Sequence, residues 1–329
     1  MNTKFKTISL LFLLVITLVS CDTSSDGDDI IISPPTSAAF KSISEKGVKR
    51  NTQNFTITAG AGAVTFTSAK GVKVNINGNC LTKNGNPVTG TVDIEYIELF
   101  DKGNMLVTNK PTMGITADGK KNLLISGGEI FIKATQGGVE LQNSCTMNMM
   151  IPTVLTDGLD NAMTLWTGVI DEKGELAWRD ANKPNADGTG GKGGVQGEGN
   201  NYYVTFGNFG WTNVDRFYSD PRPKTTLLVD APDGYDNNNS AVYLSYDGEG
   251  KNALAKLDTY TAAGLFSEHY GQIPVGLKCH VIFATEDNGN WRYAIKAVTV
   301  AANDVYTFTL AETVVGTEAQ LVAAINAIQ

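Results

Sequence analysis

Residues 129–141 read EIFIKATQGGVEL, and this stretch indicates the type of fold. Apolar and polar side chains alternate from Glu129 to Thr135, two glycines follow, and the alternation resumes from Val139 to Leu141. Alternation of period two is typical of a strand with one buried face, and a glycine pair between two such runs favours a tight hairpin. The stretch therefore predicts two antiparallel strands joined across Gln136-Gly137-Gly138.

The same pattern continues on both sides of this hairpin. In residues 91–100, TVDIEYIELF, alternation places Val92, Ile94, Tyr96 and Glu98 on one face. Further strands are expected at 55–58, 64–67, 72–76, 146–152, 163–170, 175–179, 202–206, 225–229, 241–246, 277–284, 291–300 and 305–310. Only the end of the chain has a helical pattern, because Thr317 with Gln320 forms a capping box before an apolar face that contains Leu321 and Ile325.

These patterns predict an all-β protein of tandem antiparallel β-sandwich (Ig-like) modules with a short C-terminal α-helix. The expected order is a lipoprotein signal peptide at 1–20, an acidic and proline-containing tether at 21–40, a first β-sandwich at 41–155, a middle β-rich region at 156–222 with a glycine-rich loop at 182–201, and a second β-sandwich at 223–329 that includes the helix. Asp220-Pro221-Arg222-Pro223 is the expected boundary before the last module.

The composition excludes some classes of partner and site. The chain has 329 residues, an apolar fraction of 42% that suffices for folded cores, and a formal net charge of −8. Without residues 1–20, which contain two lysines and no acid, the charge becomes −10. An acidic chain has no general attraction to phosphate backbones, so nucleic acid is not an expected partner. Two histidines, His269 and His280, leave little material for histidine-based catalysis or metal binding.

The first 21 residues have the parts of a secretory signal. Lys4 and Lys6 precede an apolar run at 10–19, which is too short for a membrane-spanning helix of about 20 residues. The following Leu18-Val19-Ser20-Cys21 resembles a bacterial lipobox. That resemblance implies cleavage before Cys21 and lipid attachment to it, and each buried CH₂ of the lipid would contribute about 0.8 kcal/mol to membrane anchoring.

Residues 22–39, DTSSDGDDIIISPPTSAA, have two interpretations. Their four aspartates and two prolines suit a plain solvated tether. Acidic residues directly after the lipidated cysteine also resemble the surface-export signals of Bacteroidota lipoproteins. The second interpretation implies a location on the outer face of the outer membrane.

The glycine-rich stretch contains a formal GxGxxG pattern at residues 188–193, GTGGKG. A dinucleotide-binding loop needs a strand before this pattern and a helix after it. Pro184 and Asn185 precede it and more glycines follow, so a simple loop is favoured and no cofactor is expected.

Acidic residues raise three further hypotheses. Asp230, Asp233 and Asp236 offer oxygen ligands for calcium, but the EF-hand spacing is absent and a turn between strands is the favoured interpretation, so no metal is expected. Glu268-His269-Tyr270 suggests acid-base chemistry, yet no GxSxG nucleophile elbow occurs in the chain. Paired carboxylates for glycoside cleavage have no local signature and stay open among 34 acids.

Three cysteines remain after Cys21, and an exported protein meets an oxidising compartment. Cys80 and Cys145 fall in the same predicted module and can form a disulfide, which would leave Cys279 free. The alternative is three buried thiols that act as small apolar side chains.

Nine aromatic residues could form a binding surface. They are the four tryptophans of the chain and five tyrosines and phenylalanines between 202 and 217: Trp166, Trp178, Tyr202, Tyr203, Phe206, Phe209, Trp211, Phe217 and Trp291. They suit either a sugar-stacking surface or core packing, and core packing is favoured. Trp211 and Phe217 are expected to be buried at a junction between modules, with Asp215 and Arg216 paired beneath them.

Two segments resemble a β-sandwich module common in Bacteroidota envelope proteins. The first consists of residues 95–111 together with 123–141, which include SGGEIFIKA at 126–134, and the second of residues 209–222, which include GWTNVDRF at 210–217. The proteins of this kind are mostly of unassigned function, so the resemblance implies architecture and location but no catalytic residue. The expected function is that of a lipid-anchored, non-enzymatic envelope protein that binds an envelope protein or polysaccharide or has a structural or adhesive role. The alternative is a secreted polysaccharide- or peptide-active enzyme whose carboxylates converge only in the fold.

Overall fold

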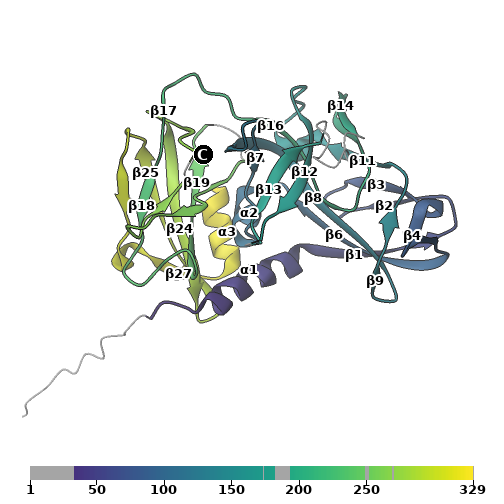
Figure 1. Ribbon diagram of the computed structural model, residues 1–329, viewed down its shortest axis with the longest axis horizontal. Coiled ribbons are helices and arrows are strands. Elements are labelled where there is room, and N and C mark those ends of the chain that lie inside the picture. The colour runs from purple at the N-terminus through teal and green to yellow at the C-terminus, as the bar shows by residue number, and fades with distance from the viewer. Residues whose placement is uncertain (1–32, 173, 182–192, 249–251, 269, 329) are drawn as a thin grey trace, which may run out of the picture. The chain divides into compact units, whose positions relative to one another are not determined.

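The computed structural model (Figure 1) describes residues 33–172, 174–181, 193–248, 252–268 and 270–328. Residues Pro34–Gln329 form one compact unit. Strands make up most of its regular structure, which confirms the predicted all-β class. The described ranges contain no helix that is both long and apolar enough to cross a membrane.

Sheet A is the largest sheet and contains a closed ring of strands. Its members are β1 (Thr52–Ala59), β6 (Gly90–Leu99), β7 (Met113–Ile115), β8 (Lys121–Gln136), β9 (Val139–Glu140), β12 (Thr164–Ile170), β13 (Leu176–Asp180) and β16 (Gly210–Phe217). The order is β1-β6-β8-β16-β12-β13-β7, and β7, the last strand in this order, also pairs with the start of β8. The strands β8, β16, β12, β13 and β7 therefore close on themselves, while β6 and β1 extend the sheet beyond the ring.

Sheet B is a five-stranded antiparallel sheet with one buried face. Its order is β14 (Gly194–Glu198), β15 (Asn201–Phe206), β11 (Met147–Pro152), β3 (Lys73–Asn77) and β2 (Ala63–Thr67). Burial alternates along β3, where Val74 and Ile76 are buried between less buried neighbours. Inward side chains of both sheets, among them Ile94 of sheet A and Val74 of sheet B, belong to one hydrophobic cluster. Burial of each such side chain stabilises the fold by about 1.5–3 kcal/mol.

The predicted hairpin at 129–141 is present. Gln136 faces Val139 across the turn, and Gly137 and Gly138 have φ of 58° and 77°. Two consecutive positive φ angles are what a type I′ hairpin turn requires, and glycine adopts them without a Cβ clash.

A small sheet and a disulfide complete this part of the chain. Sheet C has the order β10 (Gln142–Asn143), β4 (Leu81–Lys83) and β5 (Asn86–Pro87), and the 3₁₀ helix η1 (Gly78–Cys80) precedes β4. Cys80 is bonded to Cys145, so the structure forms the pair that the sequence left open and leaves Cys279 as a buried free thiol. The disulfide closes a loop of 65 residues, for which loop-closure entropy alone gives about 4 kcal/mol.

The C-terminal part of the chain forms three sheets. Two are small: β17 (Lys224–Thr225) with β23 (Ile273–Pro274), and the order β21 (Thr259–Tyr260), β22 (Phe266–Ser267), β18 (Leu228–Asp230), β26 (Val305–Thr307). The third, sheet F, has the order β20 (Ala255–Lys256), β19 (Ser240–Tyr246), β24 (Lys278–Asp287), β25 (Asn290–Thr299), β27 (Val314–Gly316). Two further 3₁₀ helices, η2 (Thr153–Thr156) and η3 (Leu310–Glu312), lie in connections.

The predicted C-terminal helix is confirmed as α3 (Glu318–Asn326). The Thr317 hydroxyl accepts from the Gln320 backbone N–H, and the Gln320 side chain accepts from the Thr317 backbone N–H. Leu321 and Ile325 are fully buried. The helix also packs on the other part of the chain, because the Asn326 side-chain oxygen accepts from the Gly103 backbone N–H at 2.8 Å.

Two helices were not predicted, so the expectation that only the end of the chain is helical is wrong. Helix α1 (Ser37–Asn51) occupies the end of the expected tether and the start of the expected first sandwich. Thr36 caps it by accepting from the Ala39 backbone N–H, and Ile43 and Gly47 are its buried residues. Helix α2 (Lys102–Val107) directly follows β6 and is capped by Asp101.

Strand pairing groups the chain differently from the predicted modules. Strands β12, β13 and β16 come from the expected middle region, yet they pair within sheet A, and β14 and β15 belong to sheet B. The boundary at 155/156 therefore does not separate sheets. Among the described residues, no strand pairing crosses 222/223, although side chains from both sides share a second hydrophobic cluster.

Candidate functional site

Several predicted sites lie outside the described residues. These are Cys21 with the lipobox, most of the acidic tether, residues 188–192 of the glycine pattern, and His269. Gly193, the last residue of that pattern, is described and leads directly into β14 rather than into a helix.

The aromatic residues are mostly core residues, as the favoured interpretation predicts. The four tryptophans are all buried, and the most exposed of them, Trp211, is 8% exposed. Trp178 lies edge-on to Trp211 at 6.2 Å between ring centroids, and Trp166 lies edge-on to Phe217 at 5.0 Å. Tyr203 differs from them because it is 44% exposed.

The two segments that carry the family resemblance lie side by side in the ring of sheet A. Strand β16 pairs with β8 so that Asn213 faces Glu129 and Asp215 faces Ser126, with a β-bulge at Gly127-Gly128. A Cβ on Gly127 would lie 2.7 Å from Val214 O, and one on Gly128 would lie 2.2 Å from the Phe100 ring. The two glycines are therefore needed for close packing at the bulge.

The bulge brings polar side chains into the ring. Trp178 on β13 contacts Trp211 on β16, although these two strands are not neighbours in the sheet. The contact therefore crosses the interior of the ring, and Trp211 and every second side chain after it on β16 point into that interior. Asn213 and Asp215 share this interior face of β16 with Trp211. The Ser126 hydroxyl donates to Asn213 Oδ1 at 3.1 Å, and Asn213 Nδ2 donates to Asp215 Oδ2 at 2.5 Å.

Two carboxyl groups of this interior are completely buried. Glu129 and Asp215 are both 0% exposed, and neither oxygen of the Glu129 side chain has a hydrogen-bond partner. The nearby Trp178 indole N–H donates to Pro111 O at 3.0 Å instead. Burial raises the pKa of Glu129 well above its usual range, and the neighbouring Asp215 raises it further. Burial likewise raises the pKa of Asp215.

These two carboxyls are the pair that the fold brings together from distant sequence positions. A glycosidase pair must contact both a substrate and a water molecule. Side chains with no exposed area cannot do so in this arrangement, so their observable role is in the packing of the ring.

Asp215 and Arg216 do not pair, so the expectation that they form a pair is wrong. Successive side chains on a strand point to opposite faces, so the two groups diverge. Asp215 lies in the ring interior, whereas Arg216 Nε donates to Asp160 Oδ2 at 2.6 Å. Trp211 also lies near the start of β16, within the ring, rather than in a connection between modules.

The acidic stretch around Asp230, Asp233 and Asp236 has the geometry of a turn. Asp236 Oδ1 accepts from the Asn238 backbone N–H at 2.8 Å, and Asp230 ends β18. His280 lies on β24, as expected, with Nδ1 2.8 Å from Asp247 Oδ1. Over the described ranges, no three His, Cys, Asp or Glu side chains gather closely enough to hold a metal ion.

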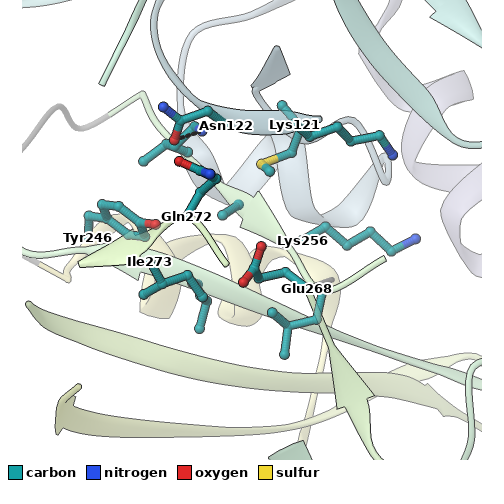
Figure 2. Close-up of a pocket in the computed structure, with 12 residues that line it drawn as sticks. Lys121, Asn122, Tyr246, Lys256, Glu268, Gln272 and Ile273 are labelled. Carbon is teal, nitrogen blue, oxygen red and sulfur yellow. Dashed lines mark hydrogen bonds between the residues drawn. The ribbon is translucent and has the colours of Figure 1, made fainter. Parts of the chain in front are cut away.

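A small cavity with a mixed polar and apolar lining lies where β8 meets the C-terminal sheets (Figure 2). Its labelled lining residues come from β8, β19, β20 and the segment that leads into β23: Lys121, Asn122, Tyr246, Lys256, Glu268, Gln272 and Ile273. The space open to the centre of a water molecule is about 10 Å³, close to the minimum for one bound water. Pockets for small-molecule ligands have volumes of roughly 300–1,000 Å³.

The charged groups around this cavity are already engaged. Lys121 Nζ donates to Asp258 Oδ2, and Lys256 Nζ donates to the Glu175 carboxylate, both at 2.6 Å. Figure 2 shows both lysine ammonium groups turned away from Glu268. Burial lowers the pKa of Lys121, but the Asp258 carboxylate outweighs this effect and the net shift is upward.

Glu268 is held by the backbone rather than by a cation. Its carboxylate accepts from the backbone N–H groups of Tyr270 and Gly271 at 3.1 and 3.0 Å. Burial raises its pKa, and these N–H donors offset part of the rise. The arrangement fits one water molecule between Glu268 and its neighbours and has no room for a substrate.

Comparisons with known proteins give no assignment. No protein-family model matches the chain, and neither a curated protein nor a solved structure matches it.

Sequence reasoning missed two buried charged residues with clear structural roles. Lys102 on α2 donates to Ser245 Oγ and to Ile328 O, both at 2.8 Å. The sequence pattern places Glu129 only at the start of a predicted strand. The glycine pair before it is the signal of a bulge, which shifts the next side chain onto the face that Ser126 occupies.

Proposed function

We propose that this protein is a lipid-anchored protein of the bacterial cell envelope, on the outer membrane and exposed at the cell surface, with a non-enzymatic binding or structural role. The lipobox ending at Cys21 and the aspartates after it support the location. Under this proposal the lipid on Cys21 is the membrane contact, and the partner is an envelope protein or polysaccharide.

The observation that carries the non-enzymatic role is the position of the most distinctive segments. SGGE at 126–129 and NVD at 213–215 pair inside the ring, where Ser126, Asn213 and Asp215 form a buried hydrogen-bonded chain. Residues placed this way lie inside a scaffold and have almost no exposed area for a substrate. A scaffold of this kind presents its outward faces to partners, which suits binding or assembly better than turnover of a small substrate.

The finer architecture belongs to the same proposal. We propose that both parts follow the plan of Ig-like β-sandwiches, with a modified first module in which the ring is completed by residues 156–217. The shared hydrophobic cluster between sheets A and B supports this plan. Surface proteins of a sandwich type use strands as the scaffold and outward surfaces as the contacts.

The anchor is tested by Cys21→Ala in the native host, followed by membrane fractionation. Lipid chains are the expected membrane contact, so the variant should leave the membrane fraction or accumulate as the unprocessed precursor. A conservative control is Ser20→Ala, which keeps a small residue before the cysteine and should stay membrane-bound. Protease treatment of intact cells should degrade the wild-type protein if it is surface-exposed. A Cys21→Ala protein that remains membrane-bound after normal cleavage would contradict the proposal.

A further inference from the structure

We infer that the outward face of sheet B is a binding site for a chain of an uncharged polysaccharide. This inference rests on the proposed envelope function and names its site and partner class. The face consists of the side chains of β2, β3, β11, β15 and β14 that point away from the hydrophobic cluster between sheets A and B. With neighbouring strands about 4.8 Å apart, five strands give a surface about 20 Å wide.

The first row across this face consists of amide and hydroxyl groups. Thr65, Asn75, Asn148 and Thr205 are aligned across four adjacent strands by the strand register. Asn75 Nδ2 donates to Thr65 Oγ1 at 2.9 Å, and Thr205 Oγ1 donates to Asn148 Oδ1 at 3.1 Å. An amide has two donors and two lone pairs, so each asparagine keeps groups for a ligand while these bonds hold its orientation.

The second row supplies an apolar platform. Lys73, Met150, Tyr203 and Gln196 are aligned in the same way, two residues further along the strands. Tyr203 is 44% exposed, whereas Tyr202 beside it points inward and is fully buried. The Tyr203 ring and the neighbouring Met150 therefore offer a flat apolar surface to the C–H face of a sugar ring, with Gln196 next to it to pair with hydroxyls.

The charge pattern selects an uncharged partner. The two rows contain one cation, Lys73, and the next row adds one carboxylate, Glu198 on β14, so the face has no excess of either charge although the chain as a whole has a net charge of −8. The opposite outward face, on β1, β6 and β8, instead carries Glu95 directly opposite Lys133, with Asp93 two residues away on β6. A polyanion would be repelled by the acidic molecule and would find one lysine, while a nucleic acid or an anionic membrane requires clustered basic residues.

A protein partner fits this face less well. Centres of protein interfaces are enriched in several aromatic residues and arginine, whereas these rows contain one aromatic ring and no arginine. Hydroxyl groups of a glycan both donate and accept, as do the amides and hydroxyls here. The chemistry of the face therefore matches an uncharged glycan best.

The test is affinity electrophoresis of the full chain in detergent, in gels that contain dextran, laminarin, xylan or mannan as neutral polysaccharides and alginate or polygalacturonate as anionic ones. We expect at least one neutral polysaccharide to retard the wild-type protein. Tyr203→Ala and Asn148→Ala should each weaken that binding by about tenfold, because each removes a central contact. Tyr203→Phe keeps the ring and should retain most of the binding.

Asn54→Ala is the matched control for Asn148→Ala, because Asn54 is an exposed asparagine on the opposite outward face. It should bind as the wild type does. The inference is overturned if none of the four neutral polysaccharides retards the protein, if only the anionic ones do, or if Tyr203→Ala and Asn148→Ala both bind normally. Thermal melting of each variant shows whether a loss of binding reflects unfolding.

The outcome is separate from that of the anchoring experiment. Retardation by a neutral polysaccharide together with a membrane-bound Cys21→Ala variant would leave the binding site standing and remove the proposed anchor. Release of that variant without any polysaccharide binding would leave the envelope location standing and remove the binding site.

Discussion

At the scale of single residues, two buried glutamates in sheet A have opposite surroundings. Glu98 accepts from Ser68 Oγ at 2.6 Å, from Gln53 Nε2 at 2.9 Å, and also from the Lys70 backbone N–H. Glu129 accepts no hydrogen bond and lies close to another carboxyl. A buried carboxylate is stable when donors surround it, whereas an unpartnered carboxyl is buried more easily in its protonated form.

This difference predicts how the stability of the protein depends on pH. The folded-state pKa of Glu129 is raised above its unfolded value of about 4.3. The contribution of the protonated Glu129 to the free energy of unfolding is therefore fully present below about pH 4.3 and is lost as the pH rises towards the folded-state pKa. The loss is at most about 1.4 kcal/mol per pH unit. Glu129→Gln keeps the shape of the protonated acid and should reduce this slope in urea unfolding measured at pH 5, 6.5 and 8.

The matched control is Glu98→Gln. It places an N–H group against existing donors and should lower the free energy of unfolding by about 1–3 kcal/mol at all three pH values. Parallel stability curves for the wild type and Glu129→Gln over this range would contradict the assignment of Glu129 as a protonated buried acid.

At the scale of elements, α3 is held by a lysine from the other part of the chain. Lys102 is 2% exposed, and its ammonium group donates to Ser245 on β19 and to the carbonyl of Ile328 just after α3. Burial lowers the pKa of Lys102, which shows that the charge is partly desolvated. A cation at the end of a helix also interacts favourably with the helix dipole.

Lys102→Met should therefore loosen α3 more than it lowers global stability. Removal of the charge relieves its desolvation, while Ile328 O and Ser245 Oγ lose their donor. We expect amide hydrogen exchange in residues 318–326 to become about tenfold faster, with smaller changes in β8. Lys46→Met, at an exposed position of α1, is the control and should leave this exchange unchanged. Equal exchange in both variants would mean that Lys102 does not hold the helix.

The elements also show how far sequence patterns reach. Strands with regular alternation, such as 91–100 and 129–135, are found as predicted because one face of each packs on a core. Helix α1 was not predicted because Phe40 and Ile43 are two of its few apolar residues and stand among serines and lysines. Its packing against the Val107 backbone involves Gly47, which has no side chain that would contribute to a helical pattern. The closed ring depends on pairing between β7 and β13, which are more than 60 residues apart, and no local pattern encodes such a pairing.

The same limit applies to sites. Burial of the tryptophans followed from the tendency of sheets to use aromatic rings in their cores. The outward face of sheet B became visible only with the register, because Asn148 and Thr205 are neighbours in the sheet but lie 57 residues apart in sequence. The lining of the small cavity, likewise, comes from β8 and the C-terminal sheets together.

At the scale of the whole unit, both hydrophobic clusters contain residues from before and after residue 222, and the second cluster includes tryptophans of the ring. Trp211, Trp178 and Leu99 belong to it together with Tyr243 and Ile282 of sheet F. Helices α1 and α3 contribute Ile43, Leu321 and Ile325 to the same cluster. Because both parts bury their apolar surface there, neither is expected to keep its full stability once the other unfolds.

This arrangement predicts a single cooperative unfolding transition, and Trp211→Ala is the change that tests it. Loss of the buried indole should cost about 3–5 kcal/mol through lost packing and a residual cavity. With Trp291 of sheet F replaced by Phe in both proteins that are compared, tryptophan fluorescence reports on the ring, which contains Trp166 and Trp178, while chemical labelling of the buried Cys279 thiol reports on β24. Burial raises the pKa of that thiol to about 12, so it reacts only after unfolding. In Trp211→Ala both signals should shift together to lower denaturant concentration. A shift in fluorescence with unchanged Cys279 labelling would show instead that the two parts unfold independently and that the shared cluster couples them weakly.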